Sequence, residues 1–312
     1  MGKATAADPS GQRVNRNKAA RKLINRLARA EKAILAMFRE IPRTRRTRAK
    51  IVNAETTVFY EYDYPAQAQE DLARDIQFTL NRELLETQNG EMPFDWYWRD
   101  DIDRAIRQGT MEEVRDFNQM TAAAIATGLL LRAVQPVPPE QVVFSDDYRN
   151  SVRSAEVGAF GSVRTISDRT ASQVLQRLNA GVNSGKSPIV VARDIKDRFD
   201  VADSSAIRTA VTEINLSYNN AKMDSTRILG AQTGLRTGVI HISALLPTTR
   251  STHANRHGNA YSLEDQMSWW DSGANRINCR CSTRSILIDS KGNVIQGDEQ
   301  ETIKTEGKEF FG

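Results

Sequence analysis

Two short clusters near the C-terminal end of the sequence constrain its fold most strongly. His253 and His257 are separated by three residues, and Cys279 and Cys281 are separated by one. A helix places the two imidazoles on one face, and an extended segment places the two sulfurs on one face. Two nitrogens and two thiolates suit tetrahedral zinc, although neither spacing is that of a common zinc finger. The sequence therefore predicts a small unit in which a helical turn and an extended segment meet.

Three interpretations of this His/Cys window remain open. In the first, His253, His257, Cys279 and Cys281 bind a structural zinc ion that stabilises a small domain. In the second, the same side chains pack through hydrogen bonds without a metal. The third is catalysis, which has less support because Ala254 stands where zinc proteases have glutamate. We assign no catalytic residues and do not expect an enzyme; the alternative is a metal-dependent nuclease or toxin-like enzyme. His241, isolated in an alternating segment, is expected to be structural.

Charge is distributed unevenly along the chain. Residues 1–50 contain 15 Lys and Arg against three acids, a net charge of +12. The whole chain has 43 basic and 39 acidic residues, so the remaining 262 residues carry 28 bases and 36 acids, a net charge of −8. A basic block of this kind favours nucleic acid, an anionic surface or an acidic protein as partner.

The basic block is expected to be a helix followed by a short basic run. Apolar residues recur at spacings of three and four across residues 17–40, which predicts an amphipathic helix that Pro42 ends. In one interpretation the following arginines contact DNA phosphates. In the other, the helix packs its apolar stripe on a partner and its charges are merely solvated. The candidate nucleic-acid-binding residues are Arg43, Arg45, Arg46 and Arg48.

The rest of the sequence predicts an α+β protein: mostly helical N-terminal and central regions, then a small C-terminal α+β domain with a short antiparallel sheet. The segment Gly181–Ser187 resembles a phosphate-binding loop, but Ala180 stands where that loop needs glycine, and a helix precedes it. We expect a helix end there. The expected elements are an extended segment at 51–65, helices within 66–135 interrupted near 89–93, a linker at 136–139, helices at 152–179, 188–199 and 204–230, a strand at 239–244 and a hairpin over 285–295.

These patterns divide the chain into five expected segments. The sequence contains no run of 18 apolar residues, so no membrane span is expected. The first residues lack the apolar segment of a secretory signal. Two cysteines one residue apart form a poor disulfide, which favours a reducing cytoplasm. The segments are a basic helical arm (1–50), a mainly helical domain (51–138), a helical region (139–230), a small α+β His/Cys domain (231–296) and a polar tail (297–312).

Several motifs together resemble a known family. Arg250, His253 and His257 follow a predicted strand, and the run Arg276–Cys281 leads into a final one. A helix with Arg208, Thr209, Glu213 and Asn219 precedes them. Over roughly residues 152–288 this combination is similar to the C-terminal domain of the Mu protein F-like minor head proteins of tailed phages, the phage head morphogenesis family. Relatives often have an aspartate shortly before the first histidine. This chain has none near Leu246, which weakens an acid-assisted catalytic centre.

The resemblance implies a structural protein inside the phage head. Its expected partners are the portal protein, the major capsid or scaffolding protein, and packaged double-stranded DNA, with no membrane. The expected location is the interior of the head at the portal vertex, and the host cytoplasm during assembly. The implied role is in head morphogenesis and in genome packaging or delivery. A basic arm suits such a location, because a protein packed against condensed DNA meets many phosphates.

Overall fold

The computed structural model describes residues 4–49, 56–85, 95–295 and 297–311, and these are mostly helical, as predicted. The chain forms two compact units, which are described separately. Unit 1 contains residues 1–19, 97–159 and 208–312, and unit 2 contains residues 20–96 and 160–207. Three long helices supply residues to both units: α1 (Arg13–Glu40), α6 (Asp146–Asn183) and α7 (Pro188–Thr233).

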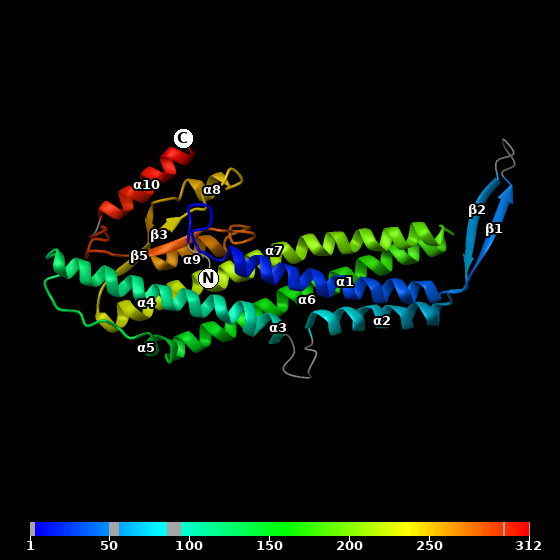
Figure 1. Ribbon diagram of the computed structural model, residues 1–312, viewed down its shortest axis with the longest axis horizontal. Helices are drawn as coiled ribbons and strands as arrows, with labels where there is room; N and C mark the ends of the chain where they lie inside the picture. Colours follow the sequence, from blue (N-terminus) through cyan, green and yellow to red (C-terminus); the bar gives the residue numbers. More distant parts are fainter. Residues whose placement is uncertain (1–3, 50–55, 86–94, 296, 312) are drawn as a thin grey trace. The chain divides into compact units, whose positions relative to one another are not determined.

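Unit 2 is built around the apolar stripe of α1. Leu23, Leu27 and Ile34 lie on one face of the helix and are fully buried. In Figure 1, α2 (Ala66–Leu85) runs beside α1, and Arg26 of α1 donates to the carbonyl of Glu83 in α2. The predicted helix is confirmed, and the stripe is buried within this chain. The expected basic arm is therefore divided: its first 19 residues belong to unit 1, and α1 from residue 20 onward belongs to unit 2.

The basic run after α1 forms a strand. β1 (Arg43–Ala49) pairs antiparallel with β2 (Thr56–Tyr62), from Arg43 opposite Tyr62 to Ala49 opposite Thr56. Figure 1 shows the two strands as a ribbon at one end of α1 and α2. The expected extended segment at 51–65 is confirmed for β2; residues 63–65 belong to no strand, and residues 50–55 lie outside the described part of the chain.

The turn between α6 and α7 fixes the base of this ribbon. The amide of Tyr60 donates to the carbonyl of Gly185 at 3.0 Å, and the Tyr62 hydroxyl donates to the carbonyl of Lys186 at 2.9 Å. Gly185 has a φ of 64°, the left-handed conformation that ends many helices. The glycine-rich segment is thus a helix end, as predicted.

Unit 1 contains a second helical layer, formed by α4 (Asp103–Ala126) and the C-terminal half of α7. Ahead of α4 lie the short helices α3 (Asp95–Tyr97) and η1 (Trp98–Ile102), and α5 (Pro139–Val143) follows it. A Cβ on Gly109 would lie 2.4 Å from the carbonyl oxygen of Tyr218, so α4 and α7 approach closely at this glycine. The two helices predicted at 188–199 and 204–230 are wrong as separate elements. The residues between them include no glycine or proline, and α7 is continuous.

A three-stranded antiparallel sheet completes unit 1, with the order β4 (Ala260–Tyr261), β3 (Thr237–Ile242) and β5 (Ser282–Leu287). One face packs Val239 against Met223 of α7 and Trp270 of α9 (Leu263–Asp271). The other face packs Ile240 against Ile303 of α10 (Gly297–Phe311). The sheet therefore lies between helices on both faces.

Two expectations for this region need correction. β5 pairs with β3, and the hairpin expected over 285–295 is reduced to a single bridge between Ile288 and Val294. The expected polar tail forms α10, whose Ile303 is buried against the sheet. Within the described residues, no helix is long and apolar enough to cross a membrane.

Candidate metal centre

The His/Cys window is folded around one face of the sheet in unit 1. His241 lies on β3, and His253 lies on the short helix α8 (Ser251–Ala254). Cys279 and Cys281 end the loop between α9 and β5. This loop passes through Asn278, which has a φ of 54° and whose amide donates to the Thr212 hydroxyl of α7 at 2.8 Å. The strand, the short helix and the loop thus carry their side chains into one buried region.

The path of the cysteine loop is also fixed by two asparagines of α7. The side-chain amides of Asn215 and Asn219 both donate to the carbonyl oxygen of Cys281, at 2.8 and 3.0 Å. Both asparagines are buried, so these bonds form away from water. Asn219 is one of the residues in the family resemblance, and holding the C-x-C backbone is its role here.

Three of the four residues predicted to bind metal come together. The Nδ1 atom of His253 lies 3.3 Å from Sγ of Cys281 and 3.7 Å from Sγ of Cys279. His241, which was expected to be structural, joins them: one ligand atom each from His241, His253 and Cys281 lie within 4.8 Å of one another. These residues form a His/His/Cys group that could hold a metal ion, and Cys279 adds a second sulfur.

His257, the fourth predicted ligand, uses both ring nitrogens elsewhere. Its Nδ1 accepts from the amide of Ser243 at 3.0 Å, and its Nε2 donates to the carbonyl of Ile303 at 2.9 Å. Two imidazoles at this spacing share a face only on a continuous helix, but α8 ends at Ala254 and the chain turns before His257. The two imidazoles therefore do not share a helical face.

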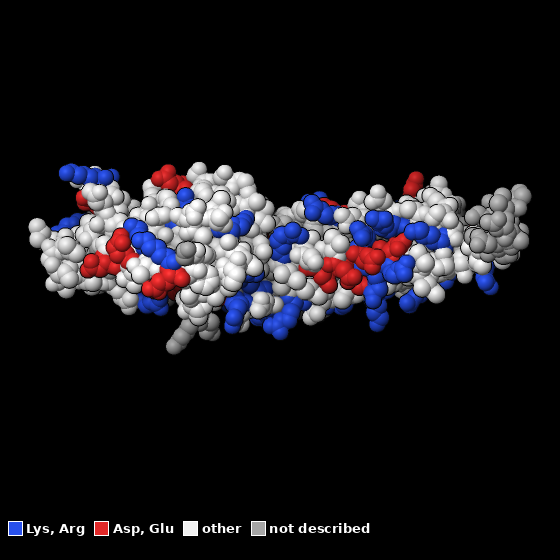
Figure 2. Space-filling model, turned by 90° about the horizontal axis from the view of Figure 1, so that it is seen from above, with Lys and Arg blue, Asp and Glu red and all other residues white. Residues whose placement is uncertain are grey.

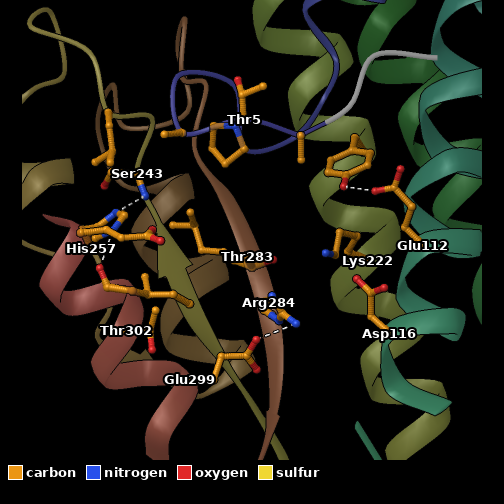
Figure 3. A pocket seen from close by; sticks show the side chains of 18 of the residues that line it. Thr5, Glu112, Asp116, Lys222, Ser243, His257, Thr283, Arg284, Glu299 and Thr302 are labelled. Carbon is orange, nitrogen blue, oxygen red and sulfur yellow. Dashed lines mark hydrogen bonds and ion pairs between the residues drawn. The ribbon is translucent and has the colours of Figure 1, made fainter. Parts of the chain in front are cut away.

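The surroundings of His257 form a separate polar pocket. It has a volume of about 810 Å³ and lies between β3, β5 and α10 on one side and α4 and α7 on the other (Figure 3). Arg284 bridges to Glu299 at 2.6 Å within it, and Lys222 of α7 contributes a buried ammonium group. Acidic and basic side chains both line this pocket, so its charge favours no single class of ligand.

A second layer of side chains orients His241. The side-chain amide of Gln266 lies 3.1 Å from Nδ1 of His241, and Arg256 donates to the Gln266 oxygen at 3.1 Å. The Arg256 guanidinium stacks on Tyr261 and Trp269, 3.6 and 4.4 Å from the ring centres. Burial, with Arg256 nearby, lowers the pKa of His241 to about 3. The ring is neutral at physiological pH, which is the state in which imidazole binds metals.

The two cysteines are electrostatically unequal. The hydrogen bond from the Cys281 thiol, followed by the bond with His253, lowers the pKa of Cys279 well below its usual value. The same bond with Cys279, together with burial, raises the pKa of Cys281. The backbone amide of Cys281 also donates to Sγ of Cys279 at 3.4 Å. This environment stabilises a thiolate at Cys279, and thiolates are the form of cysteine that binds zinc.

The site is closed to solvent. His241, His253, Cys279 and Cys281 are all at most 5% exposed. Catalytic zinc sites keep one coordination position open to water or substrate, whereas structural sites are filled by protein ligands. Burial therefore favours a structural role. Sequence reasoning missed His241 because it considered the residue alone; the period of two along β3 places it on the same buried face as Val239.

The fold and the site together define a small α+β domain that is fastened to a long helix and built around a closed His/Cys cluster. Residues 172–284 match the family model described as Phage Mu protein F like protein. This match covers the whole cluster and confirms the family resemblance for this part of the chain. The match supports assigning the chain to the class of phage head morphogenesis proteins. No curated protein and no solved structure matches the chain.

Proposed function

We propose that the protein is an internal structural component of a tailed-phage head, acting in head morphogenesis and in genome packaging or delivery. The observation that carries this proposal is the family match over residues 172–284. The proposed partners are the portal protein, the major capsid or scaffolding protein, and packaged DNA, and the proposed location is the head interior at the portal vertex. Co-purification with the portal protein of the same phage tests this, and its absence from purified heads would refute it.

The proposed DNA contact is the β1–β2 hairpin of unit 2. Side chains alternate along a strand, so Arg43 and Arg45 lie on one face of β1 while Arg46 lies on the other. Arg43, Arg45 and Arg46 are exposed, and the side chain of Arg48 lies outside the described residues. Arg46 pairs with Glu61 at 2.9 Å, but both side chains are more than half exposed. An exposed pair contributes little and exchanges readily for a phosphate.

Further cations lie at the base of the hairpin. A groove of about 600 Å³ in unit 2 is lined by apolar side chains, by four cations and by one acid, Glu31, which pairs with Lys196 at 3.9 Å. In Figure 2, basic and acidic side chains are interspersed on the face shown, so the proposal depends on this local group and on the hairpin. The four cations are Arg39, Arg43, Arg193 and Lys196.

The test uses point variants, because deleting residues 1–50 would remove α1 from the core of unit 2. Arg43→Gln, Arg45→Gln and Arg46→Gln together should weaken binding to a short DNA duplex. They should also flatten the dependence of log K on log salt by up to about 2.7, since each phosphate contact contributes about 0.9. The measurement is fluorescence anisotropy at several salt concentrations.

A matched control carries the same charge change elsewhere. Arg107, Arg115 and Arg149 are exposed residues of unit 1, each paired with an aspartate close by in the sequence. Replacing these three with glutamine should leave the salt dependence close to that of the unaltered protein. Equal losses in both triple variants would show that net charge, rather than the hairpin, governs binding.

For the His/Cys cluster we propose a structural role, with a zinc ion as the expected cofactor. The buried donor set supports this role over the nuclease alternative, because no donor is placed where a substrate could reach it.

A further inference from the structure

We propose that unit 1 holds one zinc ion, ligated by Nε2 of His241, Nδ1 of His253 and the Sγ atoms of Cys279 and Cys281. This inference rests on the structural role proposed above and replaces His257 of the sequence-based set with His241. The donor set is two imidazoles and two thiolates, a combination that selects zinc over magnesium or calcium.

The distances from His253 to the two sulfurs fit a tetrahedral ion. Zinc binds nitrogen at about 2.1 Å and sulfur at about 2.3 Å, so a nitrogen and a sulfur on one tetrahedral ion lie about 3.6 Å apart. The Nδ1 atom of His253 lies 3.3 and 3.7 Å from the two sulfurs. A hydrogen bond could explain either distance, but a neutral imidazole nitrogen has one proton or one lone pair to share. A common metal accounts for both distances together.

The unsatisfied nitrogen of His241 supplies the fourth donor. Its Nδ1 faces Gln266, and its Nε2 is buried with no hydrogen-bond partner. The ring is fully buried and has a ligand atom within 4.8 Å of those of His253 and Cys281. Buried polar atoms are nearly always satisfied, so an unpaired nitrogen on a ring that lies close to the Cys281 sulfur and a second imidazole indicates a metal ligand.

Gln266 provides a check on the state of His241. Arg256 donates to the Gln266 oxygen, which turns the Gln266 amide NH2 toward Nδ1 of His241 and favours the tautomer with hydrogen on Nε2. Metal binding at Nε2 requires hydrogen on Nδ1, so the Gln266 amide must rotate by half a turn and accept from it. Arg256 can lose its bond to Gln266 because Tyr261 and Trp269 still hold it by stacking. Gln266 is therefore a positioning residue, and the orientation of its amide differs between the metal-free and the metal-bound site.

His257 offers the matched comparison. It lies in the same unit and is similarly buried, but both of its nitrogens bond to backbone groups. Replacing it should destabilise the protein without releasing zinc. Comparing substitutions at His241 and at His257 thus distinguishes a loss of stability from the loss of a metal ligand.

The first experiment needs no substitution. The full chain is purified under reducing conditions, loaded with zinc chloride and dialysed, and its zinc content and X-ray absorption spectrum are measured. We expect about one zinc per chain with two sulfur and two nitrogen neighbours. Zinc-free protein after loading would overturn both the site and the structural-zinc role. Bound zinc with fewer than two sulfurs would overturn the ligand set alone.

The second experiment compares variants by cobalt titration, in which thiolate-bound tetrahedral cobalt absorbs visible light. His241→Gln and Cys281→Ser should each bind at least tenfold more weakly, and His257→Gln should bind as the unaltered protein does. Gln266→Leu should weaken binding by about 10- to 100-fold, as expected for a residue that orients a ligand. Gln266→Glu should bind cobalt as tightly as the unaltered protein does, because a carboxylate accepts from Nδ1 of His241 and pairs with Arg256. Loss of cobalt in His257→Gln with retention in His241→Gln would refute the set.

Discussion

At the scale of single residues, the most informative group is a buried chain of hydrogen bonds that ends at the backbone of the candidate metal centre. Arg16 of α1 pairs with Asp8 at 2.7 Å and donates to Asn215 at 3.2 Å, and Asn215 donates to the carbonyl of Cys281. Both charged side chains are at most 9% exposed. Asp8 also accepts from the amide of Arg13, so it caps the start of α1. The N-terminal segment thereby supports the loop that carries the cysteines.

Replacing Arg16 with methionine should therefore destabilise the protein strongly. The substitution keeps an apolar stem but leaves the Asp8 carboxylate buried without its partner, which costs about 3 kcal/mol or more. Urea unfolding monitored by circular dichroism measures the change. Arg13→Met is the control, since Arg13 is exposed on the same helix, and should change the free energy of unfolding by at most about 0.5 kcal/mol. Similar losses in the two variants would contradict the role of the buried pair.

At the scale of elements, the packing of α4 on α7 depends on glycine. Gly109→Ala would bring a methyl group within 2.4 Å of the Tyr218 carbonyl oxygen, which belongs to the backbone of α7 and cannot move alone. The helices must separate, at a cost of about 2 kcal/mol in the free energy of unfolding. In contrast, Gly158→Ala in α6 meets nothing within 4 Å and should stabilise by about 0.5–1 kcal/mol. Thermal melting of the two variants tests this, and a neutral Gly109→Ala would contradict the close approach.

Sequence predicts well those elements in which apolar residues recur at the period of a helix or a strand within the element itself. Leu23, Leu27 and Ile34 indicate α1, and the alternation around Val239 indicates β3. β1 was not predicted because its arginines lie on both faces and leave no alternation, so its pairing with β2 depends on contacts distant in sequence. The prediction of two helices within α7 is wrong because residues 200–203 contain neither glycine nor proline, and nothing there stops a helix.

The same limit applies to the candidate site. His253, Cys279 and Cys281 were predicted because their spacing is unusual, and spacing is visible in a sequence. His241 depends on Gln266 and Arg256, which approach it only through the pairing of β3 with β4 and the packing of α9. His257 was included because its spacing from His253 suits a helix that ends too early. Ligand identity thus depends on tertiary contacts that spacing does not contain.

At the scale of the whole molecule, the two proposed activities lie in different units. The zinc centre uses residues of unit 1, and the hairpin uses residues of unit 2. The helices α1, α6 and α7 supply residues to both units. Whether the units are energetically independent is a measurable property of the full chain.

We expect Cys281→Ser to leave DNA binding unchanged while lowering the stability of unit 1. The substitution removes a proposed metal ligand in a core of modest size, and a structural metal contributes directly to folding. Hydrogen exchange should show faster exchange in β3 and β5, with protection kept in α1 from Leu23 to Ile34, whose buried stripe belongs to unit 2. The salt dependence of DNA binding should equal that of the unaltered chain, because the arginines of β1 are untouched. Weaker DNA binding together with lost protection in α1 would instead show that unit 2 folds only when the metal centre is intact, and that zinc controls access to DNA through the shared helices.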